Sequence, residues 1–159
     1  MATRVLGIDV GTGGTRAVLL DQTGHVIASA TGEHAPISAP QIGWAEQEPC
    51  DWWRATCSAI KECLQLARIS PDDIAGVGLT GQMHGMVLLD AAGEVLRPAI
   101  IWCDQRTEAQ GRAITEKIGA SRLIELTANP ALTNFTLTKI WWVQQHEPQV
   151  WARVRTVLL

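Results

Sequence analysis

The first 32 residues constrain the fold most, because they alternate short apolar runs with glycine-rich turns. The apolar runs cover residues 4–9, 15–20 and 25–31, and the turns between them are 11–14 and 21–24. Apolar runs of this length, separated by glycines and an Asp-x-x-Gly turn, predict consecutive antiparallel strands. The sequence therefore predicts a three-stranded antiparallel meander at the start of the chain.

After residue 48 the apolar residues recur at helical spacing. Between residues 49 and 68 they step by three and four, which is one face of an amphipathic helix, and Pro49 suits its first turn. We expect the later elements in this order: a buried strand at 74–80, apolar runs at 86–89 and 99–102, helices at 105–126 and 136–146, a short helix after Pro148, and a strand from 154. This order predicts an α/β fold whose mixed sheet combines the meander with parallel strands and flanking helices.

Length and composition place the chain among ordinary globular proteins. It has 159 residues, of which 47% are hydrophobic and 18% charged, which is enough for a core and excludes intrinsic disorder. The net charge of -3, without basic runs, argues against nucleic acid or a membrane surface as a partner. The first apolar stretch ends at Asp9, too early for a signal peptide, and no run approaches the roughly 18 residues of a membrane span. We therefore expect a cytoplasmic protein.

The four cysteines give little sign of a metal site. Cys50, Cys57, Cys63 and Cys103 contain no Cys-x-x-Cys pair and no accompanying histidine spacing, so a zinc site is not expected. Three of them fall in the helix predicted over 49–68, where reduced, packed thiols are the simpler interpretation.

A first candidate site lies where the first strand turns into the second. Asp9 ends the strand, and Gly11, Thr12, Gly13 and Gly14 lead into the next one. Glycines let main-chain amides converge on phosphate oxygens, and a nearby carboxylate can orient a hydrated Mg²⁺. The alternative is a glycine-rich hairpin with an incidental aspartate. A Walker A loop is excluded, because the chain contains no Gly-Lys-Ser/Thr sequence.

A second candidate lies at the end of the strand predicted over 74–80. Gln82 and His84 can hydrogen-bond a polyhydroxylated substrate while Met83 lines its apolar face; the alternative for the histidine is a core or loop role. Gly76–Gly81 has the Gly-x-Gly-x-x-Gly spacing of a dinucleotide-binding motif. Such a site is not expected, because these glycines lie inside the predicted strand and no helix follows.

A third candidate is Trp102–Arg106, at the end of another apolar run. The face of Trp102 suits the C–H face of a sugar, and Asp104 and Arg106 can bond hydroxyls or each other. The alternative is a core tryptophan followed by an Asp104 that caps a helix.

Taken in order, these segments resemble the N-terminal portion of the FGGY carbohydrate kinases, and within that family the chain is most similar to the bacterial xylulokinases. The resemblance spans essentially the whole chain. The segments that carry it are Gly7–Arg16, Gly43–Pro49 with Trp52–Trp53, Gly81–Gly85, Arg97–Arg106 and Lys139–Pro148.

The resemblance implies an actin-like ATPase fold, related to ribonuclease H, and transfer of the ATP γ-phosphate to D-xylulose, giving D-xylulose 5-phosphate. By position, Asp9 matches the residue that holds Mg²⁺ through water. The positions that match the nucleotide phosphate site are Gly11, Thr12, Gly13, Gly14 and Arg16. Those that match the sugar site are Gln82, Met83, His84 and Trp102. In glycerol kinases the two positions that match Met83 and His84 look like Arg and Glu, so the resemblance weighs against glycerol as the substrate.

The resemblance also implies that part of the enzyme lies outside these residues. The catalytic base of the family is an aspartate expected beyond Leu159, so residues 1–159 are expected to form an incomplete N-terminal domain, inactive alone. The complete protein is expected to be a homodimer. Three alternatives stay open: a kinase for another polyol such as ribulose, gluconate or a tetritol, a non-catalytic sugar-binding fragment, and an actin- or chaperone-like ATPase. The last does not explain Gln82–His84.

Overall fold

The computed structural model describes residues 3–159, which form two compact units. Unit 1 consists of the described residues up to Pro36 together with Cys50–Gln82, and unit 2 consists of Ile37–Pro49 and Met83–Leu159. The boundary between Gln82 and Met83 falls inside the Gly81–Gly85 motif. Within the described residues, no helix is both long enough and apolar enough to cross a membrane.

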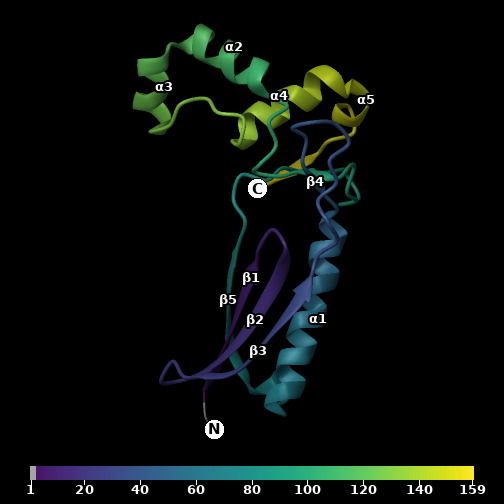
Figure 1. Cartoon of the computed structure of the whole chain (residues 1–159), viewed down its shortest axis with the longest axis vertical. Coiled ribbons are helices and arrows are strands. Elements are labelled where there is room, and N and C mark those ends of the chain that lie inside the picture. The colour runs from purple at the N-terminus through teal and green to yellow at the C-terminus, as the bar shows by residue number, and fades with distance from the viewer. Residues whose placement is uncertain (1–2) are drawn as a thin grey trace. The chain divides into compact units, whose positions relative to one another are not determined.

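Unit 1 is a four-stranded sheet with one long helix on it (Figure 1). Its strands are β1 (Arg4–Val10), β2 (Gly14–Asp21), β3 (Val26–Glu33) and β5 (Ile74–Gly81), in the order β3-β2-β1-β5. The first three form the antiparallel meander, and β5 runs parallel to β1. The helix α1 (Pro49–Ala67) precedes a short 3₁₀ turn at Pro71–Asp73. The mixed sheet predicted from the sequence is therefore confirmed.

The core of unit 1 lies between the meander and α1. Strand residues that point to the same face pack against Ala59 and Cys63 of the helix; they are Leu6, Ile8, Ala17, Leu19 and Ala30. The close approach depends on Gly32, because a Cβ at that position would lie 2.3 Å from the carbonyl oxygen of Ala55. The amphipathic spacing of α1 thus places its apolar face on the meander.

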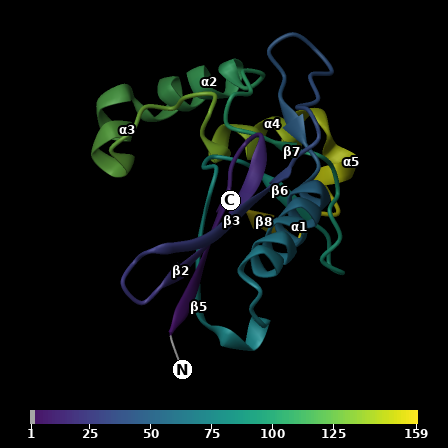
Figure 2. The same cartoon turned by 60° about the horizontal axis from the view of Figure 1, so that its bottom comes forward.

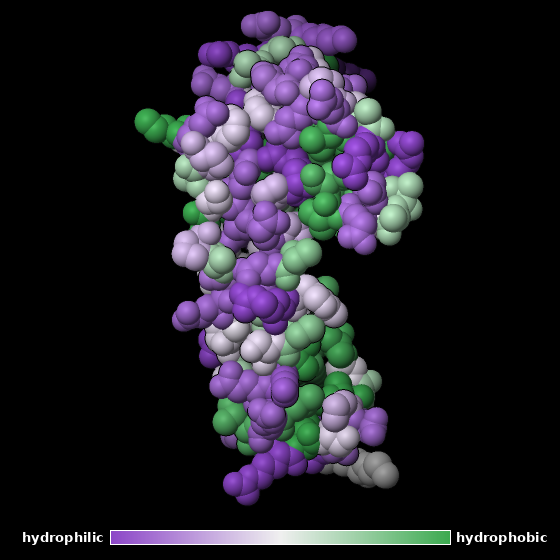
Figure 3. Space-filling view, turned by 90° about the vertical axis from the view of Figure 1, so that its right-hand side faces the viewer, coloured by the Kyte–Doolittle hydropathy of each residue, from purple (hydrophilic) through white to green (hydrophobic). Residues whose placement is uncertain are grey.

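The prediction that β5 is buried was wrong. Val77 and Leu79 are 62% and 75% exposed, and only Ile74 at the start of the strand packs against the core of unit 1. The reason is that β5 lies at the edge of the described sheet, while α1 covers the meander. Apolar side chains are also exposed on the face of unit 1 that Figure 3 shows.

Unit 2 combines two small antiparallel sheets with four helices (Figure 2). In one sheet β4 (Glu46–Gln47) pairs with β7 (Ala99–Ile100), and in the other β6 (Val87–Leu89) pairs with β8 (Thr156–Leu158). The helices are α2 (Glu108–Ile118), α3 (Ala120–Thr127), α4 (Thr136–His146) and α5 (Pro148–Trp151). A core of Met86, Leu88, Ile100, Trp142 and Val143 joins these sheets to α4.

The buried face of α4 differs from the apolar stripe in its sequence. Leu137 is 62% exposed, whereas Thr138, Lys139, Trp142 and Val143 are buried. Two of these four side chains are polar, so a hydrophobic pattern cannot reveal the face. The two polar side chains, Thr138 and Lys139, can be buried because each has a hydrogen-bond partner from a distant part of unit 2.

Two further sequence interpretations need correction. Cys50 and Cys57 are exposed, and among the helical cysteines only Cys63 is a packed thiol, whose burial raises its pKa. Asp104 does not cap a helix, because α2 begins at Glu108 with Thr107 preceding it.

Candidate functional site

The turn between β1 and β2 is a compact loop of three residues, Gly11–Gly13. The Gly11 amide donates to the Gly14 carbonyl oxygen at 3.0 Å, which closes the loop. Gly14 must remain a glycine, since a Cβ there would lie 2.8 Å from the carbonyl oxygen of Gly32. At Gly13 a Cβ would meet no atom within 4 Å, and within residues 3–159 the Gly13 amide has no hydrogen-bond partner. The tip of the turn thus offers a donor and space for a ligand.

His34, which follows β3, holds this turn from behind. Its main-chain amide donates to the Gly13 carbonyl oxygen at 3.1 Å, and its imidazole Nδ1 lies 3.4 Å from the carbonyl oxygen of Thr12. Its Nε2 forms a 2.9 Å hydrogen bond with the buried hydroxyl of Thr15. These contacts hold the carbonyl groups of Thr12 and Gly13 on the side of the turn that faces His34. Sequence reasoning missed His34, and nothing in the local pattern marks it.

Asp51 in the first turn of α1 anchors the same region. Its carboxylate accepts the Ala35 amide at 2.6 Å and pairs with Arg54. The Ala35 amide, and then the Arg54 guanidinium, hold the pKa of Asp51 below its usual value. The segment that carries His34 is therefore tied to the start of the helix.

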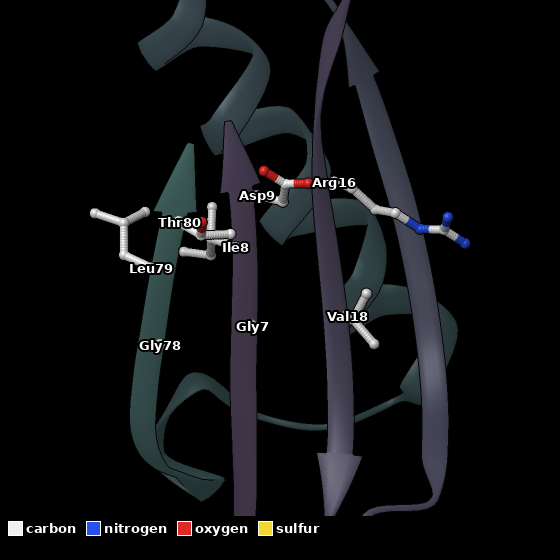
Figure 4. Close-up of a pocket in the computed structure, with 8 residues that line it drawn as sticks. All are labelled: Gly7, Ile8, Asp9, Arg16, Val18, Gly78, Leu79 and Thr80. Carbon is white, nitrogen blue, oxygen red and sulfur yellow. The ribbon is translucent and has the colours of Figure 1, made fainter. Parts of the chain in front are cut away.

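Asp9 and Arg16 lie opposite each other on β1 and β2, and Asp9 also pairs in register with Thr80 of β5. They line an open depression of about 510 Å³ on the sheet, whose floor is lowered by Gly7 and Gly78 (Figure 4). Figure 4 shows the Arg16 guanidinium pointing away from the Asp9 carboxylate. Within residues 3–159 neither group forms an ion pair, so both charges are available to a ligand.

These groups fit the chemistry of a magnesium–polyphosphate complex. Mg²⁺ keeps several of its waters and is commonly held by one or two carboxylates, so the exposed, unpaired Asp9 suits a water-mediated contact. No cluster of three or more metal-ligating side chains occurs among the described residues, which leaves Asp9 as a single carboxylate rather than part of a cage. The Gly13 amide and Arg16 are donors suited to phosphate oxygens.

Gln82 lies in unit 1, beside the Gly11–Gly13 turn. Its amide donates to the Val10 carbonyl oxygen at 2.8 Å, and its side-chain oxygen accepts the Thr12 hydroxyl at 3.4 Å. The sequence grouped Gln82 with Met83 and His84 as sugar contacts. The structure places Gln82 beside Thr12, and the two residues that follow it belong to unit 2.

His84 has an unusual main-chain conformation. Its φ is +64°, in the left-handed region that non-glycine residues seldom adopt. Its imidazole meets the Phe135 ring edge-on, with the ring centroids 4.9 Å apart. Uncommon backbone conformations of this kind cluster at binding sites, where the surrounding structure enforces them. No local pattern in the sequence marks Phe135 as a partner of His84.

Met83 of the second candidate site and Trp102 of the third both expose apolar surface. Met83 is 71% exposed and Trp102 46%. Met86 forms an antiparallel bridge with Ile100, and Met83 and Trp102 each lie within three residues of this bridge. The structure therefore brings the ends of these two segments to the same edge in unit 2, with apolar surface open to a ligand.

Asp104 and Arg106, which follow Trp102 closely, form a buried ionic network. The Arg106 guanidinium donates to both carboxylate oxygens of Asp104, and its Nη1 lies 2.7 Å from Glu46 Oε1. Glu46 also pairs with Arg97, which in turn reaches Glu147 at 2.7 Å. Asp104 accepts the Ala45 amide at 2.6 Å as well. This network joins four segments of unit 2, so these residues support the site rather than contact a ligand.

A known protein family and curated proteins are similar to this chain over nearly its whole length. The pattern that defines the N-terminal domain of the FGGY family of carbohydrate kinases matches residues 4–159. Xylulose kinase of Klebsiella pneumoniae is 44% identical over 154 residues, which cover 97% of this chain and 31% of that protein. The chain thus spans about 31% of the length of such curated relatives.

Solved structures give the same fold. Xylulose kinase from Rhodospirillum rubrum matches with a TM-score of 0.90 at 31% identity, covering 97% of this chain and 31% of that one. Gluconate kinase from Lactobacillus acidophilus also has a TM-score of 0.90, but at 24% identity it shows the fold alone; 99% of this chain and 31% of that one are covered. The expected α/β fold of the actin-like ATPase class is confirmed.

Proposed function

Because the chain belongs to the FGGY family of carbohydrate kinases, we propose that it forms the N-terminal part of an ATP-dependent kinase that converts D-xylulose to D-xylulose 5-phosphate. The observation that carries the choice of sugar is the 44% identity, over nearly the whole chain, to a protein named xylulose kinase. The Met83–His84 pair supports the same choice, because the resemblance implies Arg and Glu at these two positions in glycerol kinases.

In this proposal unit 1 binds the nucleotide phosphates. The Gly13 amide and the Arg16 guanidinium donate to phosphate oxygens, and the Asp9 carboxylate accepts from water held by Mg²⁺. When bound, Mg²⁺ neutralises charge that builds on the transferring phosphoryl group. His34 keeps the turn in place, so its donors need no rearrangement when the ligand arrives.

In the same proposal unit 2 binds the sugar. The His84 imidazole hydrogen-bonds a sugar hydroxyl, and the exposed faces of Met83 and Trp102 cover its C–H surface. Such contacts orient one hydroxyl for attack on phosphorus, which is the main task in phosphoryl transfer. The acceptor hydroxyl must also lose its proton, and we assign that step to an aspartate outside these 159 residues.

The experiment compares the complete gene product with the 159-residue chain in a coupled assay for ADP release. The panel of acceptors is D-xylulose, D-ribulose, D-gluconate, erythritol and glycerol, each with ATP and Mg²⁺. We expect the highest kcat/KM for D-xylulose with the complete protein, and no turnover above background with the chain alone. A better acceptor than D-xylulose would refute the sugar assignment, and turnover by the chain alone would refute the missing base.

Asp9→Asn in the complete protein tests the division of roles. Loss of the carboxylate should lower kcat and weaken the dependence on Mg²⁺, while calorimetric titration shows unchanged D-xylulose affinity. Asp72→Asn, at an exposed aspartate of the turn before β5, is the matched control and should change neither quantity. A weakened sugar affinity in Asp9→Asn would contradict the assignment.

A further inference from the structure

Lys139 in α4 is a buried lysine whose charge has no ion-pair partner. Its side chain has no exposed surface, although lysines are almost never fully buried unless they are paired. None of the ion pairs among residues 3–159 includes it. Its Nζ instead donates to two main-chain carbonyl oxygens, that of His84 at 2.5 Å and that of Asn134 at 2.6 Å.

One of these acceptors belongs to the residue with the left-handed backbone. Two other non-glycine residues, Arg68 and Ala128, also have positive φ, but each follows a helix, where a left-handed residue is common. His84 follows no helix, so its conformation needs another cause. The hydrogen bond from Lys139 to the His84 carbonyl supplies one, because it fixes the direction of the peptide group that His84 turns toward α4.

The start of α4 makes three contacts with the same segment. Lys139 holds the His84 carbonyl, the Thr136 hydroxyl donates to the Gly85 carbonyl oxygen at 3.1 Å, and the Phe135 ring meets the imidazole. The second acceptor of Lys139, Asn134, immediately precedes Phe135. The ammonium thus ties the main chain on both sides of the His84–Phe135 contact.

We propose that Lys139 is a positioning residue for the sugar site, where its buried ammonium holds the His84 main chain so that the imidazole faces the substrate. This inference rests on the proposed function, because it takes His84 as a sugar contact. A lysine serves here because its ammonium has three donors on a long stem and can join two carbonyls at once. An apolar side chain would fill the space but leave both carbonyls without this donor.

The test uses the complete gene product and the variant Lys139→Met, which keeps a long side chain without donors. Lys117→Met, at an exposed lysine of α2, is the matched control. We expect Lys139→Met to raise the KM for D-xylulose about tenfold and to leave the KM for ATP within about twofold. Hydrogen exchange by mass spectrometry should show amides of residues 83–86 exchanging several-fold faster than in the control.

Thr136→Val keeps the inference testable if Lys139→Met does not fold, since it removes a single hydrogen bond from the same anchor. It should raise the KM for D-xylulose about threefold, again without affecting ATP. An unchanged KM for D-xylulose in either folded variant, or equal increases for both substrates, would overturn the positioning role while leaving the proposed function intact. A wild-type protein that phosphorylates no sugar would overturn the proposed function, and this inference with it.

Discussion

Arg106 lies over the indole of Trp44, with its guanidinium carbon 3.7 Å from the ring centroid, inside unit 2. The Trp142 ring centroid is 5.0 Å from the same carbon, and the two indoles meet edge-to-face with their centroids 5.3 Å apart. Trp142 in turn stacks on His146 with the rings nearly parallel. The guanidinium therefore combines cation–π contacts with its pairing to Asp104, which only an arginine can provide at such a position.

Arg106→Lys should strongly destabilise the protein. An ammonium cannot form the two-pronged contact with Asp104 or lie flat over the Trp44 indole, and the full removal of one partner of a buried ion pair, about 3–5 kcal/mol, sets the upper bound of the loss. Thermal unfolding followed by circular dichroism measures the effect. Arg112→Lys is the matched control, because Arg112 and Glu108 are both about two-thirds exposed and such pairs contribute at most about 1 kcal/mol. Equal melting temperatures for the two variants would contradict a structural role for Arg106.

The network around Arg106 shows what the sequence could and could not reveal. The meander and α1 were predicted correctly because their signals are local: the glycine turns and the spacing of apolar residues. Asp104 was interpreted as a helix cap or a sugar contact, whereas its partners include the Ala45 amide, 59 residues away in sequence. No periodicity in the sequence encodes such a contact, and the same holds for the contacts of His34 with the Gly11–Gly13 turn.

The exposure of β5 has a related cause. Its glycine-rich apolar run was predicted to be buried, because a continuous apolar run is typical of a strand covered on both faces. Whether a strand is covered depends on its place in the sheet, and β5 lies at the edge of the described residues. The residues of a strand do not by themselves reveal its position within the sheet.

Gly13→Ala should separate folding from nucleotide binding. A Cβ at Gly13 meets no atom within 4 Å, so the melting temperature should stay within about 2 °C of wild type. The added methyl group occupies space at the tip of the turn where a phosphate would approach, so the KM for ATP should rise about tenfold with the KM for D-xylulose unchanged. Steady-state kinetics on the complete gene product measures both constants.

Two glycine variants serve as controls for this result. Gly76→Ala introduces a methyl group whose nearest atom, Val5 Cγ1, lies 4.0 Å away, on a part of β5 outside the depression that Asp9 and Arg16 line, and should leave the KM for ATP unchanged. Gly14→Ala places a Cβ 2.8 Å from the Gly32 carbonyl oxygen and should destabilise the fold itself. If Gly13→Ala left the KM for ATP unchanged, the turn would not bind phosphate.

His84→Asn tests the imidazole without disturbing the backbone. Asparagine tolerates positive φ better than other residues with a Cβ, so the left-handed conformation should persist and the melting temperature should hardly change. We expect the KM for D-xylulose to rise about tenfold while the KM for ATP stays constant. His25→Asn, at an exposed histidine of unit 1, should alter neither constant. An increase confined to ATP would show that His84 does not contact the sugar.

The protonation of Lys139 gives a prediction that does not depend on enzyme activity. Burial is the main cause that lowers the pKa of its ammonium from 10.5 to about 8, an effect that Arg106 adds to and that Asp104 and Cys103 oppose. The chain contains three lysines, so ¹³C-labelled lysine gives three ε-carbon signals, and the one missing in Lys139→Met belongs to Lys139. That signal should titrate with a midpoint near pH 8.

The same shift fixes the sign of the pH dependence of stability. Between pH 8 and 10.5 the unfolded chain binds more protons at Lys139 than the folded chain does, so the free energy of unfolding should rise with pH relative to Lys139→Met, by at most about 1.4 kcal/mol per pH unit. Urea unfolding at pH 7, 8, 9 and 10 measures the difference between the two proteins. Because burial also raises the pKa of the nearby Cys103 thiol, the comparison is made in a Cys103→Ser background. A midpoint above pH 10, or a difference that falls as pH rises from 8, would contradict the burial of a charged amine at this position.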